Sequence, residues 1–264
     1  VVCLRTAGGR VRGRDEGEAA RCREDLVEDP RQVVLGHRLE PGPRDDAGPA
    51  AAGRAAEGRV AQEPRGAAAA GEAAGLVLDE PKWVESATRA ADFIGKRMVV
   101  DGVLYATWRD GRARHPAYLD DYANLLDGLL ALLHVRWREA DIRLAKSLAD
   151  TLLTRFYDTA GGGFFFTAHD HERLIHRPKP SIDDATPSGN GVLARTLNLL
   201  GHLLGDTRYL DAASATLRWA RGAMEQYPAG HATLLAALED EVSPPELVIV
   251  RGPRVELETW LRPI

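Results

Sequence analysis

Apolar residues recur at helical spacing through most of the chain after residue 76, and this pattern predicts a series of helices separated by short turns. The expected helices cover residues 81–98, 119–137, 139–157, 187–204, 207–226 and 230–240. The run Glu246–Val250 predicts a strand, and a short helix is expected near residues 253–261. The pattern therefore favours an all-α fold with little sheet.

A weak repeat organises these helices. An acid is followed two or three residues later by an aromatic or aliphatic anchor, and the three anchors are Trp83, Ile142 and Tyr209. Since each unit would contain one helical hairpin, the repeat indicates a solenoid or a closed toroid. The short runs 102–107 and 163–167 are expected to form strands or hairpins that link one unit to the next.

The repeat also sorts the helices into two rows. Helices 119–137 and 187–204 are expected to be inner, the first because it is apolar nearly all round. Helices 81–98, 139–157 and 207–226 are expected to be outer. The starts of the inner helices should then lie at equivalent places and converge on one rim.

Composition changes sharply before this region. All aromatic residues of the chain lie from Trp83 onward, and residues 1–75 consist largely of Ala, Gly, Arg, Pro, Glu, Asp and Val. Such a segment can bury little apolar surface to offset an ordering cost of about 1–2 kcal/mol per residue. We therefore expect residues 1–75 to be disordered, or to be an out-of-frame reading of a G/C-rich gene, and residues 76–264 to form the helical domain.

Charge and cysteine content exclude several classes of function. The net charge of −5 gives no basic surface for nucleic acid, and no apolar run is long enough for a membrane span. Cys3 and Cys22 suggest neither a disulfide framework nor a zinc site. These features favour a reducing compartment, the cytoplasm.

Polar residues gather at the starts of the two inner helices and in the loop before the second one. They are Asp120, Asp121, Tyr122, Arg177, Lys179, Asp183, Asp184, Ser188 and Asn190. An acid facing an enclosed cavity at this rim could have a raised pKa and act as a general acid. At most one of the adjacent Asp120 and Asp121 can do so, and a capping role is the competing interpretation.

The start of the second inner helix has an unusual sequence. Thr186 followed by Pro187 fits an N-cap and a first helical residue. Gly189 in the first turn weakens a helix, so a ligand or a neighbouring helix should approach closely there. Arg177 and Lys179 could pair with acids across the rim or lie in a solvated loop. His169, His171 and His176 lack a ligand set at ordered spacing, so no metal and no cofactor is expected.

Four segments together carry a resemblance to a known family: AYLDDYA, FYDTAGGGFFFTAHD, DDATPSGN and GDTRYLDAA. As a set they resemble the thioredoxin-domain-containing proteins related to spermatogenesis-associated protein 20, over about residues 75–252. The resemblance implies a partial (α/α)6 toroid, similar to six-hairpin glycosidases and N-acylglucosamine 2-epimerases. The chain departs from that pattern because it lacks the thioredoxin-like domain, the first toroid helices and the closing hairpins.

The resemblance leaves four functional alternatives. A carbohydrate hydrolase would need two carboxylates about 5–9.5 Å apart, and Asp121 and Asp184 are the candidates. An epimerase would use His176 with Arg177 for proton transfer. A third alternative is a non-catalytic toroidal scaffold that accompanies the missing redox domain, and a fourth is that this chain has no activity. The expected partners are a sugar or another small molecule, and further copies of the chain that pack against exposed edges of the toroid.

Overall fold

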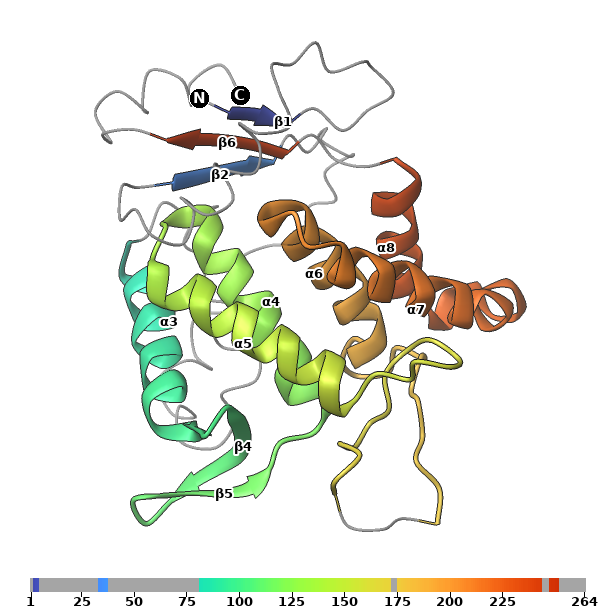
Figure 1. The fold of residues 1–264 in the computed structure, drawn as a ribbon, viewed down its shortest axis with the longest axis horizontal. Helices are drawn as coiled ribbons and strands as arrows, with labels where there is room; N and C mark the ends of the chain where they lie inside the picture. The colour runs from blue at the N-terminus through green and yellow to red at the C-terminus, as the bar shows by residue number, and fades with distance from the viewer. Residues whose placement is uncertain (1, 5–32, 38–80, 172–174, 244–246, 252–264) are drawn as a thin grey trace, which may run out of the picture.

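The computed structural model describes residues 81–171 and 175–243 in full, together with the backbone of three strands, β1 (Val2–Leu4), β2 (Val33–His37) and β6 (Leu247–Arg251) (Figure 1). The rest of segment 1–75 lies outside the described residues, so its expected disorder or shifted reading frame stays a prediction. The helix expected near residues 253–261 also lies outside them. The strand expected at Glu246–Val250 is confirmed as β6.

All six expected helices are present. They are α3 (Pro81–Phe93), α4 (Leu119–Val135), α5 (Glu139–Arg155), α6 (Gly189–Leu204), α7 (Thr207–Gln226) and α8 (Ala232–Val242). A π-helical turn, Ile94–Met98, continues α3, and a 3-10 turn, Pro228–Gly230, precedes α8. The described part of the chain is therefore mostly helical.

Two small sheets complete the described fold. β3 (Val99–Val100), β4 (Val103–Arg109) and β5 (Arg112–Pro116) form an antiparallel ribbon between α3 and α4. In the other sheet, β6 lies between β1 and β2 and is antiparallel to both. The ribbon confirms the strand expected at residues 102–107.

The second segment expected to be a strand or hairpin, 163–167, forms no continuous strand, although it folds back on the preceding residues, with the Phe165 N–H donating to the Phe156 carbonyl and the Asp158 N–H to the Gly163 carbonyl. A single antiparallel bridge joins Tyr157 and Phe164, while Gly162 and Gly163 adopt positive φ angles of 72° and 75°. The backbone turns sharply at the glycines, and the polar groups of Phe164 then bond to a side chain of α6, so no partner strand continues the ladder.

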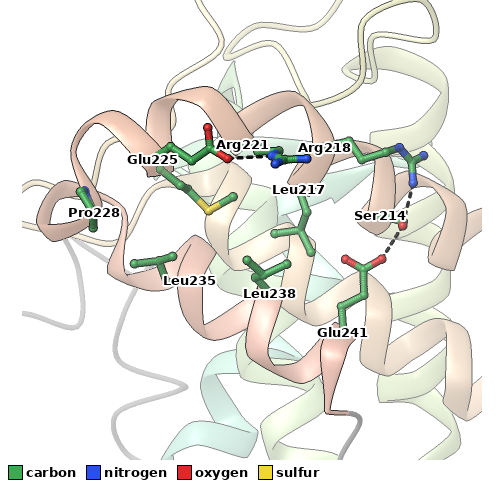
Figure 2. Close-up of a pocket in the computed structure, with 10 residues that line it drawn as sticks. Ser214, Leu217, Arg218, Arg221, Glu225, Pro228, Leu235, Leu238 and Glu241 are labelled. Atoms are coloured by element: carbon green, nitrogen blue, oxygen red, sulfur yellow. Dashed lines mark hydrogen bonds and ion pairs between the residues drawn. The ribbon is translucent and has the colours of Figure 1, made fainter.

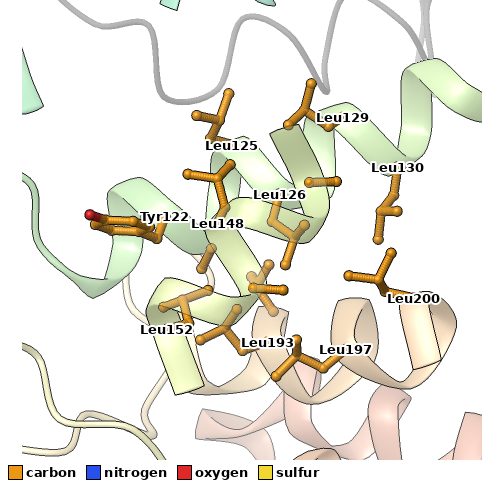
Figure 3. Close-up of a cluster of buried hydrophobic side chains, with 14 of the residues drawn as sticks. Tyr122, Leu125, Leu126, Leu129, Leu130, Leu148, Leu152, Leu193, Leu197 and Leu200 are labelled. Carbon is orange, nitrogen blue, oxygen red and sulfur yellow. The ribbon is translucent and has the colours of Figure 1, made fainter. Parts of the chain in front are cut away.

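The helices pack in a regular order. α4 contacts α3, α5 and α6, and α6 in turn contacts α7 and α8. Leucines of α4, α5 and α6 form the centre of the core (Figure 3), among them Leu126, Leu148 and Leu193. Helix α4 is buried on nearly every side, which explains why its sequence is apolar on every face.

Polar contacts join α3, α5 and α7. Arg138, which precedes α5, donates to Asp92 of α3. Asp150 of α5 accepts from the Tyr209 hydroxyl of α7 at 2.8 Å and from Arg208 at 3.1 Å. These contacts link α3, α5 and α7 in sequence order.

Candidate functional site

The start of α6 contacts the starts of both α4 and α8. A Cβ on Gly189 would clash with Oδ1 of Asp120 and lie 3.1 Å from Leu119 Cγ, both on α4. A Cβ on Gly191 would lie 2.9 Å from Cβ of Thr233 on α8. The glycines at the start of α6 are thus required by two neighbouring helices, and no ligand is needed to explain them.

Asp183 ties the start of α6 to the start of α8. Its Oδ1 accepts from the Ser188 N–H at 2.9 Å, and its Oδ2 accepts from the Thr233 N–H at 2.7 Å. Burial raises the pKa of this carboxyl, but hydrogen bonds from the backbone and side chains of Ser188 and Thr233 together outweigh burial and hold the pKa below its ordinary value. Asp183 is therefore ionised at neutral pH and engaged in helix capping.

Asp121 also has a capping position. It is 7% exposed, and its Oδ2 accepts from the Tyr118 N–H at 2.9 Å, which closes the first turn of α4. Its neighbour Asp120 lies half-buried against the start of α6. The Asp121 side chain therefore lies where a helix-capping residue is expected.

Tyr122 is a core residue with one polar contact. It is 1% exposed, its ring contacts Phe156, and its hydroxyl accepts from the Leu104 N–H at 2.9 Å. Burial raises the pKa of the Tyr122 hydroxyl, and the Leu104 N–H offsets part of that rise. The side chain therefore fixes β4 against α4.

Ser188 caps α6, with its Oγ accepting from the Gly191 N–H at 3.2 Å. The expected cap at Thr186 is wrong: Pro187 precedes the N-cap, and the helix begins one residue after Ser188. Asn190 is fully buried, its Oδ1 accepts from the Phe164 N–H, and its Nδ2 donates to the carbonyls of Phe164 and Pro180. Its amide thus replaces the missing partner strand of the 163–167 segment.

The two cations hold the preceding loops together. Lys179 Nζ lies 2.7 Å from Asp158 Oδ2 and donates to the Gly162 carbonyl. That ammonium holds the pKa of the Asp158 carboxyl below its ordinary value. Arg177 donates to the Thr167 carbonyl at 2.6 Å and lies over the Phe165 ring. Neither cation has an ion pair with the acids of the helix starts.

Asp184 and His176 are both exposed to solvent, and their side chains take no part in the contacts described above. The structure therefore brings together Asp120, Ser188 and Asn190 around the start of α6, and Asp183 with the start of α8. It leaves Asp184 outside this arrangement. Within the described residues, no group of three or more His, Cys, Asp and Glu side chains could hold a metal ion.

Three buried polar atoms beside the start of α4 have no hydrogen-bond partner among the described residues. Thr167 Oγ1, His171 Nδ1 and Arg177 Nε are buried and make no hydrogen bond. The rings of Tyr118 and Phe166 stack nearby at 5.0 Å and 8°, and His171 lies 5.6 Å from Tyr118. We call Tyr118, Phe166, Thr167, His171 and Arg177 the loop cluster. Buried donors and acceptors of this kind need a partner, which a water or a polar ligand can supply.

Sequence reasoning missed a buried ionic centre at the start of α5. Asp141 is 2% exposed and accepts from Arg136 at 2.5 Å and from Arg138 at 2.8 Å. Arg136 also donates to Thr88 of α3. The sequence signal for this centre was the pair of arginines, Arg136 and Arg138, placed shortly before Asp141.

A groove lies between α7 and α8 (Figure 2) and has a volume of about 570 Å³. Leu217, Met224, Leu235 and Leu238 form its apolar floor, and Arg and Glu residues lie along its rim. None of the nine residues expected from the sequence lines this groove.

The class of protein that this fold defines is a mostly helical domain with two small antiparallel sheets. No protein-family model matches the chain. It is 29% identical over 194 residues to human spermatogenesis-associated protein 20, an alignment that covers 69% of this chain and 25% of that protein. It is 30% identical over 187 residues to the rat protein of the same name, covering 67% and 24%.

A third relative is an uncharacterized protein of Caenorhabditis elegans, 24% identical over 188 residues, with 68% of this chain and 26% of that protein covered. The chain is therefore related to spermatogenesis-associated protein 20 and spans about a quarter of the length of these relatives. None of the described helices has the length and apolarity that a membrane crossing needs.

Proposed function

We propose that this chain is a non-catalytic helical scaffold, whose polar residues at the helix starts hold neighbouring helices together. The observation that carries the proposal is the position of the two acids expected to act as a pair. Asp121 is buried and closes the first turn of α4, whereas Asp184 is exposed. A hydrolase would need both carboxylates on one enclosed substrate site.

The remaining residues of the expected site support the same proposal. Asp183 caps two helix starts, Asn190 bonds to two loops, and Lys179 pairs with Asp158. A group whose hydrogen bonds are used to position the backbone is poorly placed to change partners during a reaction. The expected scaffold would accompany a redox domain in the longer relatives.

We also propose that the scaffold is an arc of an α/α toroid. In that arrangement α4, α6 and α8 form the inner row, and α3, α5 and α7 form the outer row. The contacts of α6 with both α4 and α8 support it, as do the Asp92–Arg138 and Asp150–Tyr209 contacts between successive outer units. A small-angle scattering curve of a longer relative that fits an extended rod would contradict the arc.

Paired substitutions test the scaffold proposal. Asp121→Asn should lower the free energy of unfolding by about 1–2 kcal/mol, because it weakens a cap, while Asp184→Asn should leave it within about 0.5 kcal/mol of the unsubstituted chain. Neither carboxylate should be needed for a chemical step. Turnover of a glycoside panel that is lost in both variants, with stability retained in Asp184→Asn, would instead support a hydrolase.

A second candidate function is binding of a sugar or similar polar ligand at the loop cluster. Its supporting observation is that Thr167 Oγ1 and Arg177 Nε are buried without partners beside the stacked Tyr118 and Phe166 rings. A sugar offers hydroxyls for the polar atoms and an apolar face for a ring. Calorimetric titration with a panel of monosaccharides, repeated with Arg177→Ala, tests it, and the absence of saturable binding to the unsubstituted chain removes this candidate.

A further inference from the structure

Ser181 and His231 form a hydrogen-bonded pair at the start of α8. The Ser181 hydroxyl lies 3.2 Å from Nε2 of His231, across a sequence separation of 50 residues. On the other side of the ring, Nδ1 of His231 lies 2.8 Å from the Tyr227 carbonyl oxygen. His231 is 2% exposed, whereas Ser181 is half-buried, so the serine is the member of the pair that solvent can reach.

The two contacts of the imidazole fix which of its nitrogens carries the proton. A carbonyl oxygen can only accept, so Nδ1 of the neutral His231 ring donates to Tyr227. Nε2 then presents a lone pair, and the Ser181 hydroxyl donates its proton to that nitrogen. A hydroxyl that donates to an imidazole, which a further acceptor orients, has the arrangement of an activated nucleophile and its base.

The backbone on both sides of Ser181 is held in place. The Pro180 carbonyl accepts from the buried amide of Asn190 at 2.8 Å. The Asp183 N–H donates to the Gly230 carbonyl at 2.8 Å, which ties the serine loop to the residue before the histidine. A pair fixed in this way needs little further ordering when a reactant arrives.

The surroundings of the pair suit an acyl group. The Tyr227 ring is 56% exposed, lies edge-on to the His231 ring with centroids 6.4 Å apart, and packs so closely on Gly230 that a Cβ there would clash with it. This ring offers an apolar surface to an acyl chain. The Ala232 and Leu234 N–H groups donate to no acceptor in the described part of the chain. Such a helix start favours the negative charge that develops on an acyl oxygen.

We propose that Ser181 is a site of covalent acylation, with His231 as its general base and an ester as the acyl donor. Oγ of Ser181 bonds to the acyl carbon while the bond from that carbon to the leaving alcohol oxygen breaks. The Ser181 proton passes to Nε2 of His231 and from there to the leaving oxygen. This modification goes beyond the scaffold function and does not depend on it, because no carboxylate takes part in the step.

A fluorophosphonate and p-nitrophenyl acetate test the acylation on the full 264-residue chain. The fluorophosphonate labels activated serines irreversibly and should form one adduct, which peptide mass spectrometry locates at Ser181. His231→Asn keeps a donor for the Tyr227 carbonyl but lacks Nε2, and it should slow the labelling at least about 100-fold. Excess p-nitrophenyl acetate should also slow the labelling, because the ester competes for the same hydroxyl.

Two further variants make the result specific. Ser181→Ala should abolish the adduct, whereas Ser147→Ala removes an exposed serine of α5 and should leave the labelling rate unchanged. Circular dichroism of each variant shows whether its fold is retained. A bond between Ser181 and His231 that is only structural gives no adduct on the unsubstituted chain, and this result overturns the proposal. So does labelling of Ser181 at an unchanged rate in His231→Asn, or labelling that excess p-nitrophenyl acetate does not slow.

Discussion

The carboxylate of Asp183 accepts the Thr233 N–H at 2.7 Å across a sequence separation of 50 residues, while its other oxygen accepts the Ser188 N–H. One side chain thereby satisfies backbone donors at the starts of two helices. Asp183→Ala should lower the free energy of unfolding by about 2–3 kcal/mol, because it removes two caps. Urea denaturation measures the loss. Asp184→Ala is the matched control and should change stability by less than about 0.5 kcal/mol.

The same carboxylate should make stability depend on pH. Its folded-state pKa is lowered, so its contribution is fully present above the unfolded-state pKa and is lost as the pH falls through the folded-state pKa. The difference in unfolding free energy between the unsubstituted chain and Asp183→Asn should therefore be constant near pH 7 and shrink below about pH 4. A difference that is equal at neutral and acid pH would show that the ionised form has no special role.

Gly189 should tolerate no side chain, because Asp120 occupies the space of its Cβ. Gly189→Ala should cost about 1–3 kcal/mol despite the better helix propensity of alanine. The double variant Gly189→Ala with Asp120→Ala should recover part of this loss. Gly222→Ala, in α7, is the control, since a Cβ there meets nothing within 4 Å, and it should be neutral or stabilising by up to about 1 kcal/mol. Thermal unfolding of all four proteins separates the steric effect from propensity.

Asp141 should be among the residues most sensitive to substitution in the described domain. Asp141→Asn removes a buried charge that accepts from Arg136 and Arg138 and should lower the unfolding free energy by about 2–4 kcal/mol. Arg143→Gln, in the exposed pair with Glu139, should cost less than about 1 kcal/mol. Equal effects in both variants, measured by chemical denaturation, would contradict the assignment of Asp141 as a structural centre.

The helices were predictable from the sequence because their apolar periodicity is strong. The conformation of segment 163–167 was not predictable, because its aromatic run resembles a strand while Gly162 and Gly163 turn the backbone. The candidate site shows a similar limit. Sequence placed Asp121 and Asn190 near one another, but whether their polar atoms face a cavity or a backbone N–H depends on about an ångström of packing, which no spacing rule encodes.

The close approach of the glycine turn to α7 gives the molecule an optical reporter. Gly163 is so near the Trp219 ring that a Cβ would lie 2.7 Å from it, and the Lys179 ammonium lies 5.0 Å from the same ring. An indole in contact with a loop and a cation changes its emission when either one leaves. In a variant whose other four tryptophans are replaced by phenylalanine, the fluorescence of Trp219 should therefore report when this loop leaves α7.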